Sequence, residues 1–494
     1  MIELYIDNAS FAHEIFELLK AFMPDKQVIV VEDKNDVKYS SLTITVDCKD
    51  SHIDAKLWDK RNIIDTNIEL LEDILAQTDR LLRTRYEKNA AKRCVYGLIS
   101  RLLEKDLDWG ILTGIRPTKI VNELLDERRY TNEDIIKILD REYKLSESKS
   151  NLLIDTVSQQ RDILAGNSDD MISLYIHIPF CTTRCLYCSF PSDTIARCED
   201  VLDAYIAALL YEWDSVLPKL LNKGFSVQTL YIGGGTPTAL PIHNLRQLLK
   251  GIDTIAKPNL EEYTVEAGRP DSLTVEKLKL LKEYGVGRIS INPQTMNEGT
   301  LKTIGRAHTP KDIKLCFEAA RRIGFDSINM DVIVGLPGEG LREIENTMRQ
   351  IFNLSPDNLT VHTLAIKRGS PLRDRLSDFE FAKETLAEEM LNECDKWAQK
   401  MGMRPYYLYR QKYILGNLEN IGYAKPHKRC LYNIQMMEEK QTIFGFGAGG
   451  MSKIFFSSNN RIERVANVKD YRQYIYRVDE MIQRKLNMID QMVI

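Results

Sequence analysis

The sequence predicts an α/β protein whose central part is a parallel β-sheet, either open or curled into a partial barrel. Between residues 171 and 366, short apolar runs alternate with amphipathic segments of helical period. The strand-like runs lie at 174–178, 227–232, 262–266, 287–292, 327–333 and 358–363, with helical segments such as 200–222, 271–284, 310–323 and 340–353. Successive β/α units of this kind form parallel sheets with right-handed crossovers, and their functional residues gather at the carboxyl ends of the strands.

Two regions of different character flank this central part. The expected elements of the first region are strands at 2–6, 28–31 and 42–46 and helices at about 65–104, 131–142 and 146–165. The small and polar residues of the segment 164–170 predict that it is a linker. After residue 366, a helix at about 380–401 precedes stretches rich in tyrosine and glycine. We therefore expect an N-terminal α+β and helical domain at 1–165, a β/α domain at 171–366 and a C-terminal α+β extension at 367–494.

The composition is that of an ordinary globular protein and argues against several classes of partner. Of the 494 residues, 44% are hydrophobic and 28% are charged. With 67 basic and 71 acidic residues the formal net charge is −4, which argues against nucleic acid or an anionic membrane as a partner. We find neither a transmembrane segment nor a signal peptide, and therefore expect a cytoplasmic protein. Six of the nine cysteines are scattered singly, as is typical of a reducing compartment.

Three cysteines lie close together directly after the first strand of the central part. Cys181, Cys185 and Cys188 form a C-x3-C-x2-C pattern that matches none of the common structural zinc spacings. Thiolates are soft ligands for iron–sulfur clusters, zinc or Cu(I). A four-iron cluster with three cysteine ligands would keep one iron open for another ligand. Two alternatives remain, namely a zinc site completed by His177 or Cys198, and three buried cysteines without a metal.

The cysteine loop resembles that of the radical S-adenosylmethionine (SAM) superfamily. The resemblance rests on the C-x3-C-x2-C pattern, on Tyr187 before its last cysteine, and on the preceding strand, which ends in His-Ile-Pro-Phe. Within the superfamily, this stretch is similar to the oxygen-independent coproporphyrinogen III dehydrogenase group. The resemblance implies a partial (β/α)6 barrel, a [4Fe-4S] cluster on Cys181, Cys185 and Cys188, and SAM chelated to the fourth iron.

Polar residues at the ends of the other strands are candidates for SAM contacts. The run Gly233-Gly-Gly-Thr-Pro237 follows the second strand, where glycines let the backbone approach a ligand and present N–H groups to it. Glu266 ends the third strand, where a carboxylate suits a ribose hydroxyl, although a solvated carboxylate is the alternative. Asp331 lies inside an apolar run and should therefore have a partner or a ligand. The resemblance implies SAM contacts for Tyr175, Tyr187, Gly234, Gly235, Thr236, Glu266, Gln294, Arg306 and Asp331.

The C-terminal region combines aromatic and basic residues at 403–410 and 422–433, followed by the glycine run 444–450. This combination suits a flat apolar ligand edged with carboxylates. Tyrosines that are half-buried in a sheet extension would give the same pattern. The glycine run also occurs in relatives of the group, which favours a place beside the SAM pocket. His177 and His362 lie within strand patterns, which favours core positions for both.

Two further stretches, Gly114-Ile-Arg-Pro-Thr-Lys119 and Glu438-Glu-Lys-Gln-Thr442, are similar to the HemZ-type branch of the group. Established dehydrogenases carry another cysteine two residues after the motif, whereas this chain has Phe190, as do haem chaperones of the HemW type. The resemblance implies an enzyme of tetrapyrrole metabolism that decarboxylates the propionates of coproporphyrinogen III to vinyl groups. The open alternatives are a haem-ring-opening enzyme, and a haem-binding chaperone with Cys430, His427 or His308 as axial ligand.

The expected partners follow from this resemblance. They are a tetrapyrrole substrate and an electron donor such as a flavodoxin or ferredoxin, and we expect a monomer without nucleic acid or membrane partners. The segment 110–119 is either a turn with solvated charges or a binding loop for an anion such as a propionate carboxylate.

Overall fold

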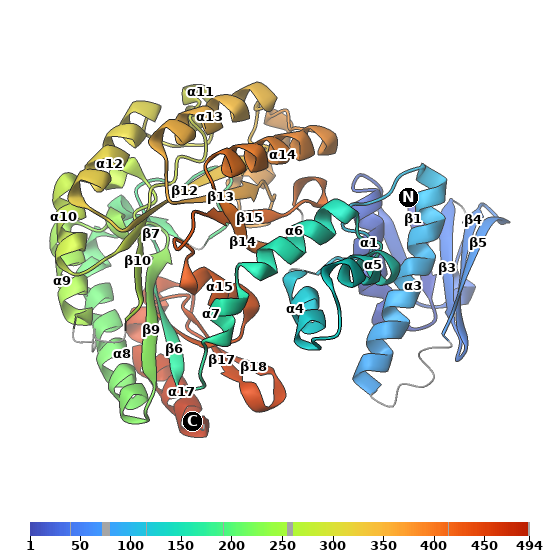
Figure 1. The fold of residues 1–494 in the computed structure, drawn as a ribbon, viewed down its shortest axis with the longest axis horizontal. Coiled ribbons are helices and arrows are strands. Elements are labelled where there is room, and N and C mark those ends of the chain that lie inside the picture. The colour runs from blue at the N-terminus through green and yellow to red at the C-terminus, as the bar shows by residue number, and fades with distance from the viewer. Residues whose placement is uncertain are drawn as a thin grey trace. The chain divides into compact units, whose positions relative to one another are not determined.

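The computed structural model describes residues 1–492, except 40, 72–79, 115, 191, 254–259 and 413. The chain forms two compact units, Met1–Ile154 and Asp155–Ile494, whose elements are labelled in Figure 1. The second unit holds the central β/α part together with the C-terminal region. The three domains expected from the sequence, with a boundary near residue 366, stay a prediction.

A five-stranded sheet organises the first unit. Its strands are β1 Ile2–Ile6, β2 Val28–Val31, β3 Leu42–Cys48, β4 His52–Asp59 and β5 Asn62–Leu70, in the spatial order β2-β1-β3-β4-β5. The helices α1 Ala12–Phe22 and α3 Arg80–Leu103 pack against this sheet (Figure 1). The cross-strand neighbours Leu4, Ile44 and Leu57 are fully buried and form part of its core. The three strands expected at 2–6, 28–31 and 42–46 are confirmed.

The helix expected at about 65–104 is wrong at its start. Asn62–Leu70 is strand β5, which pairs antiparallel with β4 along its length. The side chains of Ile68 and Leu70 are 60% and 64% exposed, so this stretch has no buried apolar stripe of helical period. Pairing with a neighbouring strand is a tertiary contact that outweighs local helix propensity here. Helix α3 confirms the later part, and residues 72–79 of the expected helix lie outside the described residues.

Four shorter helices precede the central sheet, namely α4 Thr118–Asp126, α5 Asn132–Tyr143, α6 Glu147–Ser158 and α7 Arg161–Ala165. A capping box between Thr131 and Asp134 starts α5, which confirms the helix expected at 131–142. The helix expected at 146–165 is interrupted by a turn, where Gln160 Nε2 donates a hydrogen bond to Tyr406 O at 3.0 Å. In the segment 110–119, α4 begins at Thr118, and Ile115 lies outside the described residues.

An eleven-stranded sheet organises the second unit. Its parallel core consists of β6 Met171–Ile178, β9 Ser226–Gly234, β10 Glu262–Glu266, β11 Arg288–Ser290, β12 Ser327–Val334 and β13 Asn358–Thr363, which are neighbours in chain order. The helices α8 Leu202–Asn222, α9 Ile242–Ile252, α10 Val275–Glu283, α11 Glu298–Thr303, α12 Pro310–Ile323 and α13 Leu341–Leu354 lie outside this sheet (Figure 1). All six expected strands are confirmed, and with them the partial β/α barrel. Parallel pairing brings the carboxyl ends of these strands to one edge.

The C-terminal region extends the sheet at both edges. Beside β13 lie the antiparallel strands β15 Asn420–Ala424 and β14 Arg404–Tyr409, whereas β16 Thr442–Phe446 is parallel to β6 and precedes β17 Met451–Phe456 and β18 Arg461–Ala466. The helices are α14 Glu384–Lys400, α15 Leu431–Glu438, α16 Tyr471–Tyr476 and α17 Val478–Gln491. The aromatic stretch 403–410 is thus part of a sheet extension, one of the two interpretations left open. Helix α14 confirms the helix expected at about 380–401.

A buried ion pair joins α17 to α8, and its carboxylate also binds the glycine run. Lys485 Nζ lies 2.5 Å from Glu212 Oε1 of α8, and both side chains are inaccessible to solvent. Glu212 also accepts hydrogen bonds from Tyr474 Oη at 2.7 Å and Gly447 N at 2.9 Å. Gly447 has a φ of 83°, and a Cβ at this position would lie 2.5 Å from His177 O. The network therefore holds the glycine run tightly against the end of β6.

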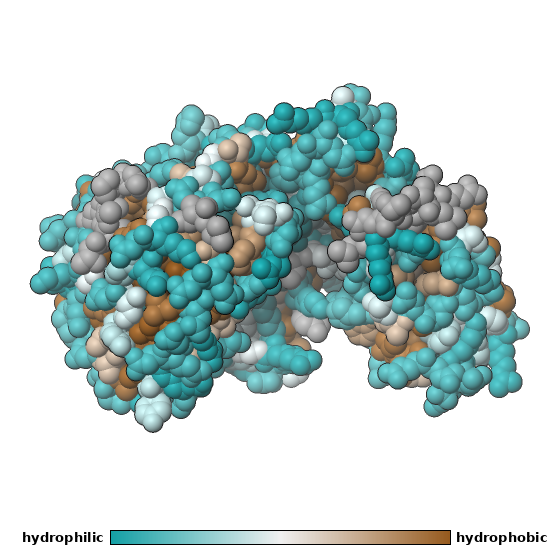
Figure 2. Space-filling view, turned by 90° about the horizontal axis from the view of Figure 1, so that it is seen from below, coloured by the Kyte–Doolittle hydropathy of each residue, from teal (hydrophilic) through white to brown (hydrophobic). Residues whose placement is uncertain are grey.

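The surface is mainly polar. Hydrophilic residues cover much of the face in Figure 2, and apolar residues form separate patches between them. The exposed apolar side chains include Ile63, Ile68 and Leu70 of β5. Among the described residues, none of the helices combines the length and the apolar composition needed to cross a bilayer.

Candidate active site

A cavity of about 400 Å³ lies at the carboxyl ends of the parallel strands in the second unit. Its volume falls in the range of small-molecule sites. Every residue that the sequence singled out for cluster or SAM binding lines it: Tyr175, Cys181, Cys185, Tyr187, Cys188, Gly234, Gly235, Thr236, Glu266, Gln294, Arg306 and Asp331. These residues come from loops and strand ends spread over more than 150 positions of the chain, and the fold brings them together.

The cysteine loop is closed at its base by a short two-stranded bridge. Strand β7 Phe180–Cys181 pairs in parallel with β8 Asp193–Thr194, so the loop leaves and rejoins the fold at one place. All three loop cysteines are free thiols, with Cys185 buried and the other two partly exposed. Burial raises the pKa of Cys181, and it raises that of Cys188 to about 11. Metal binding by these thiols therefore requires the release of protons.

The glycines after β9 allow the chain to pack closely on the start of the cysteine loop. Gly234 has a φ of 109°, a conformation that favours glycine. Gly235 N donates a hydrogen bond to Ile178 O at 2.8 Å, and Thr236 N donates one to Phe180 O at 2.7 Å. These two N–H groups are engaged within the protein, which corrects the expectation that the glycine run presents them to a ligand. What remains on the cavity side is the Thr236 hydroxyl and the backbone surface.

Two carboxylates line the cavity from β10 and β12. Glu266 accepts a hydrogen bond from Tyr231 Oη at 2.7 Å, and burial raises the pKa of Glu266 to about 7. Asp331 accepts one from Asn329 Nδ2 at 2.7 Å and lies 3.6 Å from His362 Nε2. Asp331 therefore has the partners that its position in an apolar run required. The carboxylates can accept hydrogen bonds from hydroxyl or ammonium groups of a ligand.

Gln294 and Arg306 add an amide and a guanidinium group. Gln294 has a φ of 65°, a left-handed conformation that costs about 1–3 kcal/mol for a residue other than glycine. Its backbone is held there by a hydrogen bond from Gln294 N to Asp331 O at 2.9 Å. Arg306 Nη2 donates to Tyr187 Oη at 2.9 Å, and Nη1 donates to Asn292 O at 2.8 Å. The guanidinium thus fixes the aromatic residue of the cysteine loop.

Three tyrosines, of which Tyr432 is buried and the other two are partly buried, form a stack beside the carboxylates. The ring centroids of Tyr175 and Tyr231 are 6.1 Å apart, and those of Tyr231 and Tyr432 are 4.4 Å apart. Tyr175 and Tyr231 line the cavity. The stack gives one wall of the cavity a rigid aromatic surface, and the Tyr231 hydroxyl orients Glu266.

Sequence reasoning missed several residues at this site. Arg269, in the loop after β10, donates from Nη1 to Cys185 Sγ at 3.3 Å and forms an ion pair with Asp271. His362 lines the cavity, so the core position expected for it is wrong, whereas His177 is buried as expected. Lys367 also lines the cavity, and burial lowers its pKa. The signal available for all three was their place just after a parallel strand or at its end.

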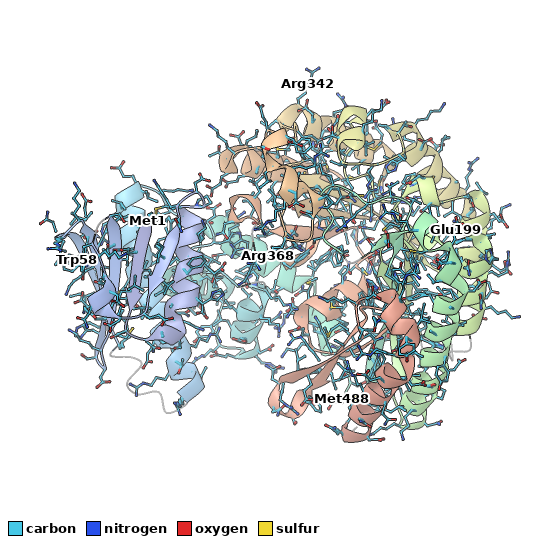
Figure 3. All side chains as sticks on the ribbon, turned by 180° about the vertical axis from the view of Figure 1, so that it is seen from behind. Met1, Trp58, Glu199, Arg342, Arg368 and Met488 are labelled. Carbon is cyan, nitrogen blue, oxygen red and sulfur yellow. The ribbon has the colours of Figure 1, made fainter. Side chains whose placement is uncertain are left out.

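The loop after β13 forms part of the cavity rim. It carries Lys367 and continues to the exposed Arg368, which is labelled in Figure 3. Phe190, two residues after the last cysteine of the motif, also lines the cavity and is 59% exposed. An exposed phenylalanine at a cavity rim is available for contact with an apolar ligand.

The alternative metal ligands named from the sequence do not line the cavity. His177, Cys198, Cys430, His308 and His427 are absent from the residues described as lining it. Cys198 Sγ instead donates to Tyr471 Oη at 3.3 Å, and Cys430 Sγ donates to Glu262 Oε1 at 3.2 Å. Within the described part of the chain, no three His, Cys, Asp or Glu side chains converge as ligands of a single metal ion. A four-iron cluster binds its thiolates on separate irons, so its cysteines need not converge on one point.

The cavity also contains polar atoms that the protein leaves unsatisfied. The buried atoms Ser290 Oγ, Asn292 Oδ1 and Arg306 Nε have no hydrogen-bond partner among the described residues, and all three residues line the cavity. Buried polar groups without partners are rare in native proteins and call for a ligand or water. Together with three free thiols, these atoms fit a cluster with a polar organic ligand beside it.

Comparison with known proteins shows the family of this chain. A model of the radical SAM superfamily matches residues 175–351. Over 392 residues, the chain is 38% identical to an oxygen-independent coproporphyrinogen-III oxidase-like protein, HemZ, of Bacillus subtilis (strain 168), with 78% of this chain and 77% of the relative covered. It is 33% identical over 305 residues to the heme chaperone HemW of the same organism, with 61% and 75% covered.

A solved structure shares the fold. Coproporphyrinogen III oxidase (HemN) from Escherichia coli, described as a radical SAM enzyme, superposes with a TM-score of 0.51 at 23% identity, with 66% of this chain and 73% of that chain covered. All predicted cluster and SAM residues lie inside the matched range 175–351, and the similarity to HemZ reaches well beyond it. The chain belongs to the radical SAM superfamily, in the HemZ-type branch of its oxygen-independent coproporphyrinogen III oxidase group.

Proposed function

We propose that this protein is an oxygen-sensitive radical SAM enzyme of tetrapyrrole metabolism that converts propionate side chains of coproporphyrinogen III to vinyl groups. The observation that carries the proposal is the convergence of three free thiols, two carboxylates and a buried guanidinium on one cavity. A relative that is 38% identical over most of the chain and is named as coproporphyrinogen-III oxidase-like supports the choice of substrate.

Cys181, Cys185 and Cys188 would hold the [4Fe-4S] cluster as thiolates. When bound, the cluster and SAM supply a 5′-deoxyadenosyl radical that can remove a hydrogen atom from an unactivated carbon. The protein shields this chemistry, because Cys185 is buried and the closed loop covers the other two thiols in part. Exclusion of water protects a reactive species from side reactions.

The residues around the cysteines would bind and orient SAM. Arg306, Gln294 and Asp331 offer groups for its carboxylate, amine and ribose, and Glu266 at the end of β10 suits the ribose hydroxyls. The remaining candidates are the aromatic and glycine-run residues Tyr175, Tyr187, Gly234, Gly235 and Thr236. Fixing the ligand against the substrate carbon is the main task left to these side chains.

Other residues that line the cavity suit a flat substrate with carboxylates. Tyr407 and Tyr409 of β14 line it together with Phe190, and their rings offer apolar surface for a tetrapyrrole. Lys367 and Arg184 also line the cavity and bring positive charge for propionate groups. A reduced flavodoxin or ferredoxin would donate the one electron that SAM cleavage requires, and an electron acceptor would take the electron that the substrate radical releases together with CO2.

A haem chaperone is the second candidate function. It is favoured by Phe190, which stands where established dehydrogenases of the group have a cysteine, and by the 33% identity to a heme chaperone. In this version the cavity would bind haem and the cluster would regulate its release. The three axial-ligand candidates from the sequence lie outside the cavity lining, so this function would need another ligand or hydrophobic binding alone.

Product analysis under strict anaerobiosis separates these functions. We would incubate the cluster-loaded protein with SAM, a reductant and coproporphyrinogen III, and analyse the tetrapyrroles by mass spectrometry. Protoporphyrinogen IX is the expected product. SAM cleavage without conversion of the substrate would contradict the proposal, stable haem binding without turnover would favour the chaperone, and a linear tetrapyrrole would identify a ring-opening enzyme.

The Cys181→Ala variant tests the cluster assignment in the same assay. We expect complete loss of product and of cluster iron and sulfide, because one of three ligands is removed. Cys48→Ala is the matched control, since Cys48 lies in the first unit and is a free cysteine that should not affect the cluster. Full cluster content in Cys181→Ala would contradict the assignment.

A further inference from the structure

A buried arginine touches the cysteine loop from the loop after β10. Arg269 is 3% exposed, and its Nη1 donates hydrogen bonds to Thr183 O at 3.1 Å and to Cys185 Sγ at 3.3 Å. The guanidinium carries a permanent positive charge and five N–H donors. One of the three thiols is therefore in direct contact with a fixed cation that also holds the backbone of its loop.

An aspartate fixes the orientation of this arginine. Asp271 accepts hydrogen bonds from Arg269 Nε and Nη2, each at 3.0 Å, in a bidentate arrangement. Asp271 also accepts one from Thr182 Oγ1 of the cysteine loop at 2.6 Å and lies 3.3 Å from His308 Nδ1. Asp271, held in turn by Thr182 and His308 from two other segments, thus fixes the guanidinium in a single position.

The other loop thiols have different surroundings. Cys181 Sγ has the neutral Thr236 hydroxyl as a hydrogen-bond donor, at the longer distance of 3.7 Å. Arg184, inside the loop, directs its Nη2 to Gly369 O at 2.8 Å. The contact between Arg269 and Cys185 is therefore a specific feature of one of the three predicted cluster ligands.

We propose that Arg269 is a positioning residue that raises the reduction potential of the cluster by holding a cationic donor at Cys185. The inference rests on the proposed function, because it assumes the four-iron cluster. Hydrogen bonds to the sulfurs and nearby charge set the potential of such clusters. A fixed cation stabilises the more negative, reduced form, and an electron then reaches the cluster more readily from its donor.

The test is an anaerobic redox titration of the full-length, cluster-loaded protein, followed by electron paramagnetic resonance. For Arg269→Gln we expect the ratio of reduced to oxidised cluster at a fixed potential to fall about tenfold, which is about 59 mV for a one-electron couple. Arg269→Lys keeps the positive charge but not the fork-shaped donor, so the reduction potential of its cluster should lie between those of the wild type and Arg269→Gln. Arg321→Gln is the matched control, because it breaks another arginine–aspartate pair, Arg321 with Asp357, away from the cysteines.

Cluster content separates redox tuning from a merely structural role. A fully loaded Arg269→Gln protein with the wild-type potential would overturn the inference. Loss of the cluster in both the Gln and the Lys variants would also overturn it, since Arg269 would then only build the loop. If the wild-type chain itself binds no four-iron cluster, the proposed function fails instead, so the two failures are distinguishable.

Discussion

Two glutamates on one strand show how differently the two ends of the parallel sheet are built. Glu262 begins β10 and is surrounded by donors, with Arg288 Nε at 3.3 Å, Leu431 N at 2.9 Å and Tyr432 N at 3.1 Å. Glu266 ends the same strand, and its hydrogen bond from a side chain comes from the neutral Tyr231 hydroxyl. A carboxylate at the amino end has a cationic partner, whereas the one at the carboxyl end faces a cavity.

The amino end of the strand contributes to stability, whereas the carboxyl end is available for binding. At the amino end, Glu262 joins β10 to the start of α15 and compensates the buried charge of Arg288. At the carboxyl end, the burial of Glu266 raises its pKa to about 7, and nearby polar atoms of Ser290 and Asn292 have no partner among the described residues. Polar groups left unsatisfied by the fold cost stability and are available to a ligand.

The largest expected effect is on the amino-end carboxylate. Glu262→Gln should lower the free energy of unfolding by about 3–5 kcal/mol, because it leaves the buried Arg288 without its countercharge. Urea denaturation of the cofactor-free protein measures this change. Glu261→Gln, at the exposed neighbouring position, is the control and should change the stability by less than about 0.5 kcal/mol. Equal stability of Glu262→Gln and Glu261→Gln would show that the carboxylate at the amino end of the strand does not stabilise the fold.

The next effect concerns the pH dependence caused by Glu266. Its folded-state pKa of about 7 lies above the usual value of 4.5, so the folded state binds the proton more tightly. The resulting stabilisation is fully present below pH 4.5 and is lost as the pH rises to about 7, by roughly 3 kcal/mol in all. Glu266→Gln should lack this loss and be more stable than the wild type at pH 7.5. Parallel stability curves between pH 4.5 and 7.5 would contradict the burial of a titrating carboxyl.

The smallest effect is that of the hydroxyl that orients Glu266. Tyr231→Phe removes a hydrogen bond that lowers the pKa of Glu266, so that pKa should rise above its wild-type value. The midpoint of the pH-dependent stability would report the shift. Tyr263→Phe is the matched control, because this buried hydroxyl of β10 has no hydrogen-bond partner among the described residues. A shift of equal size in both variants would show that the Tyr231 contact is not its cause.

The fold of the second unit and most of its site could be predicted because one topological rule covers both. Parallel strands place their carboxyl ends at one edge, so the cysteine loop after β6 and the carboxylates of β10 and β12 had to meet. The rule needs only the order of strands and helices, which the hydrophobic pattern gives. It does not depend on details of loop conformation.

Contacts made within loops could not be predicted in this way. Arg269 and its contact with Cys185 depend on how the segment after β10 folds back under the cysteine loop. The N–H groups of Gly235 and Thr236 are engaged by β6 and β7, which only the distance between the chains reveals. Strand β5 was mistaken for the start of a helix for a related reason, since its pairing with β4 is not encoded in its own residues.

The pairing of β16 with β6 has a consequence for the order of events during synthesis. Strand β6 leads directly into the cysteine loop, and one of its two neighbours, β16, is made only after the whole barrel has left the ribosome. Until then β6 is an edge strand with unpaired backbone groups, and the glycine run that packs on His177 does not yet exist. For the proposed cluster, this order would place the insertion of iron and sulfide late in maturation, after β16 has joined the sheet.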